Sequence, residues 1–232
     1  MSTKKFHGNM TKFFYNPISL TKSTRTFFPN LQTLFVYSSK DNLFEDDDRI
    51  IAREIQFIPY YLTSNEKKQI EEWTELKCKE ILFNSDVDNW RCRYSTFNQQ
   101  IFGKSKVLFL IESEDGQKFG YYCNTILNYD NYEWMRTENM KSFEFNLESN
   151  GRLPKPMKFE KISRYKEYQW YTINDFLLVE LGNIRLAKEN NKTKSHCYQN
   201  PKEVKFDYHG IENALCGGKY FTPKRILVIQ MK

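Results

Sequence analysis

Residues 106–124 constrain the fold more than any other part of the chain. Two runs rich in β-forming residues, 107–111 and 118–123, flank the pair Asp115-Gly116. Glycine readily takes the positive φ that a tight turn requires, so the two runs are predicted to form an antiparallel hairpin. The first run is apolar without alternation, which is typical of a strand buried on both faces. Gly120 interrupts the second run and predicts a bulge or a close approach between two backbones.

The rest of the chain after the hairpin has the pattern of further short strands. Residues 141–147 alternate, which places Phe143, Phe145 and Leu147 on one face. Further strands are expected at 157–162, 165–171, 176–181, 184–187 and 225–231. Short strands at such regular spacing predict an α+β, β-dominated fold, a two-layer antiparallel β-sandwich with a few flanking helices.

Two helices are expected before the hairpin. Thr63 is a suitable N-cap, and Glu66 stands where its carboxylate can reach back to the cap, so a helix is predicted over 64–79. Ile70 and Trp73 fall on one face of that helix. A shorter helix is expected over 94–102, and a short strand over 81–83.

Composition and charge suggest where the chain resides and how it divides. No apolar run approaches the length of a membrane span, and the first residues lack the apolar segment of a secretory signal. Five widely spaced cysteines without a C-x-x-C pair indicate reduced thiols, so a cytoplasmic or nuclear location without membrane insertion is expected. We expect a basic N-terminal arm at 1–26, a leucine-rich-repeat-like fragment at 27–62 docking on the main domain, and that domain at 63–232.

Cysteines and histidines that could act as nucleophiles, bases or metal ligands cluster only near the C-terminus. Cys197, His209 and Cys216 combine nucleophile and imidazole types, with His196 beside the first cysteine. They lack the short paired spacing of zinc ligands, and spacing alone places no imidazole beside a thiol. The sequence therefore predicts no metal site, cofactor or catalytic residue, and the chain is not expected to be an enzyme. Cys197 and Cys216 are kept as candidate redox thiols.

The N-terminal arm is a candidate nucleic-acid contact. Residues 1–40 hold six lysines and arginines and no acidic residue, while residues 150–232 hold sixteen basic and eight acidic side chains. Basic side chains interleaved with aromatic rings suit phosphate contact and base stacking, although no named DNA-binding motif accompanies them. The candidate contacts are Lys4, Lys5, Lys12, Lys22 and Arg25.

Taken together, residues 97–103, 107–122 and 142–147 resemble the TLDc domain family in its short helix, its hairpin ending in Phe-Gly and its Ser-Phe-x-Phe strand. Residues 206–217 and 222–230, and the repeat-like fragment before the domain, resemble the amoebozoan-type variant of that family. The resemblance implies a β-sandwich with flanking helices and a role in protection against oxidative stress. In animal members it implies contact with the vacuolar ATPase. It carries over no catalytic residue.

Three functional hypotheses follow from these observations. The first is a non-enzymatic protein-interaction domain in an oxidative-stress response. The second is a sequence-specific DNA-binding stress regulator that uses the basic arm and the basic C-terminal segment. The third is an uncharacterised enzyme.

Overall fold

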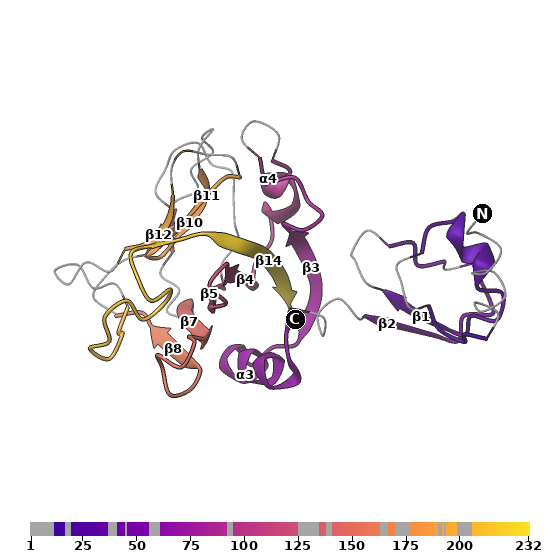
Figure 1. The fold of residues 1–232 in the computed structure, drawn as a ribbon, viewed down its shortest axis with the longest axis horizontal. Helices are drawn as coiled ribbons and strands as arrows, with labels where there is room; N and C mark the ends of the chain where they lie inside the picture. The colour runs from indigo at the N-terminus through magenta and orange to yellow at the C-terminus, as the bar shows by residue number, and fades with distance from the viewer. Residues whose placement is uncertain are drawn as a thin grey trace. The chain divides into compact units, whose positions relative to one another are not determined.

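The structure is a computed structural model that describes residues 12–16, 20–36, 41–44, 46–55, 61–91, 95–124, 135–137, 141–162, 167–169, 177–189, 192, 194–198 and 206–232. The chain divides into two compact units, Met1–Lys67 and Lys68–Lys232, and each is described by itself. Figure 1 draws the elements of both units. Among the described residues, no helix has the length and apolar character needed to cross a membrane.

The N-terminal unit contains a short parallel sheet. Strand β1 (Thr33–Val36) pairs in parallel with β2 (Ala52–Ile55), and a 3-10 helix, η1 (Thr24–Phe27), precedes them. Leucines of the repeat-like stretch are buried here with other apolar side chains of the unit, namely Leu20, Phe28, Leu31, Leu34 and Ile50.

Helix α3 (Ser64–Thr74) begins at the predicted capping box. The backbone N–H of Glu66 donates to Thr63 Oγ1 at 3.2 Å, and the Thr63 N–H donates to the Glu66 carboxylate at 2.7 Å. The predicted end at residue 79 is wrong, because Glu75 adopts a positive φ of 58° and stops the helix. Cys78 then opens β3 (Cys78–Asn84), which pairs with the C-terminal strand.

The C-terminal unit is built on a six-stranded antiparallel sheet with the order β3-β14-β4-β5-β7-β8. Its other strands are β4 (Val107–Ser113), β5 (Lys118–Cys123), β7 (Phe143–Glu148), β8 (Met157–Glu160) and β14 (Pro223–Met231). The predicted hairpin is confirmed: β4 pairs with β5 from Val107↔Cys123 to Glu112↔Lys118, and Gly116 has φ 85°. The C-terminal strand lies between β3 and β4.

A second antiparallel sheet has the order β10-β11-β12-β13. Its strands are β10 (Leu177–Leu181), β11 (Ile184–Ala187), β12 (Ser195–Cys197) and β13 (Tyr220–Phe221). A separate pair joins β6 (Met135–Thr137) to β9 (Glu167–Gln169), so the strand expected at 165–171 is described only over its three central residues. The helix expected at 94–102 is shorter, α4 (Phe97–Ile101).

The core of the C-terminal unit lies between its two sheets, which face each other in Figure 1. Phe109 and Tyr121 from the larger sheet belong to one buried cluster with Val179 and Leu186 from the smaller one. The fold is therefore the predicted β-dominated α+β sandwich of two antiparallel layers with a few helices.

Strand β7 is buried on both faces, and one face is apolar while the other is polar. Phe143 and Phe145 contact the ring of Trp73 on α3, at centroid distances of 6.2 and 6.1 Å. The alternate residues, Glu144 and Asn146, bond to groups beyond the other face of the sheet. The predicted alternation is correct, but its apolar side faces the helix and its polar side faces the sandwich interior.

Candidate functional site

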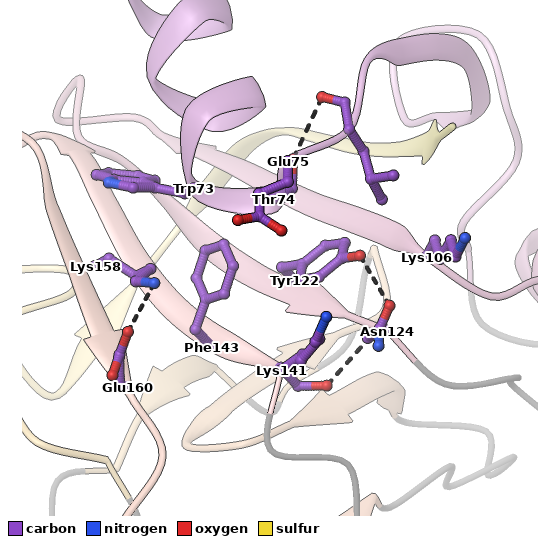
Figure 2. A pocket seen from close by; sticks show the side chains of 12 residues that line it. Trp73, Thr74, Glu75, Lys106, Tyr122, Asn124, Lys141, Phe143, Lys158 and Glu160 are labelled. Carbon is purple, nitrogen blue, oxygen red and sulfur yellow. Dashed lines mark hydrogen bonds and ion pairs between the residues drawn. The ribbon is translucent and has the colours of Figure 1, made fainter.

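A cavity of about 440 Å³ lies in the C-terminal unit between the end of α3 and the outer face of β5, β7 and β8, as Figure 2 shows. Its walls come from five segments of the chain that are distant in sequence. The lining residues are Trp73, Thr74, Glu75, Leu76, Lys106, Tyr122, Asn124, Lys141, Ser142, Phe143, Lys158 and Glu160.

Aromatic rings form one wall of this cavity. The rings of Tyr122 and Phe143 lie 5.2 Å apart between centroids, and Trp73 meets Phe143 edge to face at 82°. Phe143 and Tyr122 are buried, and the Tyr122 hydroxyl donates to Asn124 Oδ1 at 3.0 Å. Burial, assisted by the nearby Cys123, raises the pKa of Tyr122 to about 12. The phenol therefore stays neutral and acts as a hydrogen-bond donor at physiological pH.

Lysines supply positive charge along the aromatic wall. Lys158 Nζ lies 5.2 Å from the centre of the Phe143 ring and 2.7 Å from a Glu160 carboxylate oxygen. This arrangement combines a cation–π contact with an ion pair. Lys141 extends toward Tyr122 in Figure 2, and Lys106 joins the same lining. With two glutamates present, three lysines leave the lining with a formal excess of one positive charge.

Two backbone conformations at the cavity are unfavourable for their residue types. Glu75 has φ 58° and Lys106 has φ 55°, and both residues line the cavity. A side chain with a Cβ pays a steric cost in the left-handed region, which glycine avoids. Such strained residues persist when their surroundings hold them, and they concentrate at functional sites. Both residues with positive φ thus lie in the lining of this one cavity.

The structure brings the two candidate redox thiols together inside the sandwich, away from this cavity lining. Cys197 and Cys216 are both buried in the core cluster, and their thiols lie close enough to affect each other's pKa. Cys216 Sγ also donates to the carbonyl oxygen of Gly218 at 2.9 Å. Burial raises the pKa of Cys197, whereas the Cys197 thiol lowers that of Cys216.

The histidines of the same sequence cluster take other positions. His209 is exposed, with Nδ1 3.5 Å from a carboxylate oxygen of Asp207. His196 is partly exposed on β12, and its ring meets that of Tyr220 at 6.1 Å. Within the described part of the chain, neither imidazole hydrogen-bonds a thiol, and no three His, Cys, Asp or Glu side chains group as metal ligands.

The candidate nucleic-acid residues are only partly available for contact. Lys4 and Lys5 lie outside the described residues, while Lys12 and Lys22 are exposed. Arg25 is buried at 6% exposure, pairs with the Asp47 carboxylate and donates to the Phe28 carbonyl. A guanidinium held inside the fold in this way does not reach a phosphate, so the expectation for Arg25 needs correction. Its role in the N-terminal unit is structural.

Comparison with known proteins adds no relationship: no protein-family model matches the chain, and no curated protein gives a significant match. The resemblance to the TLDc family therefore stays a prediction. The cavity itself was not predicted from the sequence. Its available signals were Trp73 on the predicted face of the helix with Ile70, and Lys141 two residues before Phe143.

Proposed function

We propose that this chain is a non-enzymatic protein-interaction domain, and that the cavity beside α3 receives an acidic segment of the partner. The observation that carries the proposal is the aromatic wall of Trp73, Tyr122 and Phe143 with lysines arranged along it. Tryptophan and tyrosine concentrate in the energetic centres of protein interfaces. Lysine ammonium groups beside them complement carboxylates and steer an acidic partner toward the site.

The chemistry of the lining favours one acidic residue with an apolar neighbour on the partner. Phe143 is already covered by the Lys158 ammonium group, and Glu160 holds that ammonium at 2.7 Å. An incoming carboxylate can take over the ammonium from Glu160 while an apolar side chain packs against Trp73. A volume of about 440 Å³ is sufficient for such a pair of side chains.

The test compares charge-reversal variants that change the net charge equally. Lys141→Glu/Lys158→Glu alters the cavity, and Lys155→Glu/Lys192→Glu alters two exposed lysines of the same unit outside its lining. Each protein is used for affinity purification from its native cells, and co-purifying proteins are identified. We expect at least one partner to be retained by wild type and the control pair but lost by the cavity pair.

That partner, purified, is then titrated by calorimetry against the three proteins. The cavity pair is expected to weaken binding by at least about tenfold, corresponding to roughly 1.4 kcal/mol. Removal of the partner's acidic segment is expected to abolish the difference between the cavity and control pairs. Equal affinity of the cavity pair and wild type for every purified partner would refute the proposal.

Two predictions of the sequence accompany this proposal. A role in oxidative stress and a contact with a vacuolar ATPase subunit are supported only by the TLDc resemblance. DNA binding remains the alternative, supported by exposed Lys12 and Lys22 but weakened by the burial of Arg25. An electrophoretic shift that disappears between low and physiological salt would favour that alternative.

A further inference from the structure

The paired thiols lie at a defined place in the smaller sheet. Cys197 ends β12 and is buried, while its neighbour His196 is turned toward the outer face. The register of β12 with β13, His196↔Tyr220, is extended by a hydrogen bond from the Cys197 N–H to the Lys219 carbonyl at 3.0 Å. The turn that carries Cys216 is therefore held directly beside Cys197.

Two hydrogen bonds hold Cys216 in this turn, one to its backbone carbonyl and one from its thiol. Its carbonyl accepts a hydrogen bond from Gln117 Nε2 at 2.8 Å, and its thiol donates to the Gly218 carbonyl at 2.9 Å. The Cys197 thiol lies close enough to Cys216 to affect its pKa. The two cysteines, 19 positions apart in sequence, are brought together in the same buried cluster by the pairing of β12 with the turn that carries Cys216.

The two thiols differ in acidity, and the difference has a structural source. The Cys197 thiol lowers the pKa of Cys216 most, backbone hydrogen bonds at Gly218 and Cys216 and the nearby Arg152 guanidinium lower it further, and burial opposes them. Arg152 is fixed there by Gln117 Oε1 at 3.0 Å and the Leu215 carbonyl at 3.3 Å. Burial raises the pKa of Cys197. Cys216 is therefore the more readily formed thiolate, and Cys197 the thiol that stays neutral.

Cys216 is buried, but the turn that follows it is open to solvent. The next two residues are glycines: Gly217 is exposed, and a side chain added at Gly218 would meet nothing within 4 Å. The turn beside the buried sulfur is therefore open over Gly218, whereas the Gln117 and Arg152 side chains lie beside Gly217, 3.0 and 3.1 Å from where its Cβ would be.

We propose that Cys216 and Cys197 are a peroxide-reactive pair that closes to a disulfide, an activity separate from partner binding in the α3 cavity. The Cys216 thiolate attacks one oxygen of a hydroperoxide, the O–O bond breaks, and the leaving oxygen takes a proton and departs as water or an alcohol. Cys216 becomes a sulfenic acid. The Cys197 sulfur then attacks the Cys216 sulfur, the S–O bond breaks, and water departs with the Cys197 proton. Two electrons from the two thiols reduce one peroxide.

The reaction is tested on the reduced full chain, shown to be folded by circular dichroism. The protein is treated with a small excess of hydrogen peroxide, its intact mass is measured, and free thiols are then blocked by alkylation for peptide mapping. We expect a loss of about 2 Da, for the two hydrogens removed, that dithiothreitol reverses. Trypsin cuts the chain between the two cysteines, so a linked pair of peptides, 195–202 with 206–219, is expected.

Single variants separate the two roles and control for folding. Cys197→Ser is expected to stop at the sulfenic acid, which dimedone then labels on Cys216. Cys216→Ser is expected to form neither product, and Cys123→Ser, a buried cysteine outside the pair, is expected to behave like wild type. A folded wild-type chain that loses no hydrogens, or a disulfide that joins any other cysteines, would overturn the proposal. The wild-type peptide map decides the matter even if a variant fails to fold.

Discussion

Gly120 stands at a close approach between β4 and β5, and replacing it with alanine is the most informative test of the sheet. It pairs with Leu110 of β4 and Phe145 of β7. A Cβ at this position would lie 1.8 Å from the Phe109 carbonyl oxygen and 2.8 Å from Phe145 Cζ. This confirms the predicted close backbone approach. Since non-bonded heavy atoms settle near 3.5 Å, β4 and β5 would have to separate by roughly 1.5 Å.

The expected cost of Gly120→Ala follows from that separation. Overpacking of a core position costs about 1–3 kcal/mol, and each strained or broken backbone hydrogen bond adds about 1 kcal/mol. A loss of roughly 3–4 kcal/mol in the free energy of unfolding is therefore expected. At about 2–4 °C per kcal/mol for a unit of this size, the melting temperature should fall by about 6–16 °C.

Urea denaturation followed by tryptophan fluorescence measures this change. Gly218→Ala is the matched control, because a Cβ there meets nothing within 4 Å and the change should stay within about 0.5 kcal/mol. A Gly120→Ala protein within about 1 kcal/mol of wild type would show that β4 and β5 do not approach as described.

Three further perturbations have defined outcomes. Glu144→Ala removes the buried acceptor of the Asn183 N–H, at 2.6 Å, and of the Tyr208 hydroxyl, so urea denaturation should show a loss of about 3 kcal/mol, with a smaller loss for Glu144→Gln. Glu75→Gly relieves the positive φ and should raise the free energy of unfolding in the same assay by about 0.5–1 kcal/mol. The side-chain hydrogen bond from Arg49 lowers the pKa of Asp47 from 3.8 to about 2. Since a depressed folded pKa stabilises only while the carboxylate is charged, the protection of amides in the N-terminal unit, measured relative to the intrinsic exchange rate, should fall as pH falls from about 4 to 2, and Asp47→Asn should remove that dependence.

Local signals were sufficient where neighbouring residues determine the backbone. The Asp115-Gly116 turn is such a case, since Gly116 has the positive φ of the turn and its N–H donates to the Ser113 carbonyl at 2.9 Å. The capping box at Thr63 is another, because both of its hydrogen bonds join residues three apart. Each of these features depends on contacts within one turn of chain.

The end of α3 shows where local reasoning fails. Leu76 and Lys77 continue the helical pattern, yet the helix stops at Thr74. The Lys77 N–H donates to the Lys232 carbonyl at 2.7 Å, and β3 pairs with β14 from the far end of the chain. Pairing with a central strand thus overrides a modest helical preference. The cavity depends on this override, because it places Glu75 at the turn between helix and strand.

Histidine and cysteine of the sequence cluster point to opposite faces of the sheet, because side chains alternate along a strand. Because adjacent residues of a strand point to opposite faces, an inward Cys197 requires an outward His196. The adjacency of His196 and Cys197 in sequence therefore could not pair imidazole with thiol. Cys197 instead lies beside the turn that carries Cys216, 19 residues later in the chain. The pKa of Cys216 is lowered by a second thiol first, then by backbone hydrogen bonds and an arginine. If that is correct, its reactivity with peroxide should not follow the titration of any histidine.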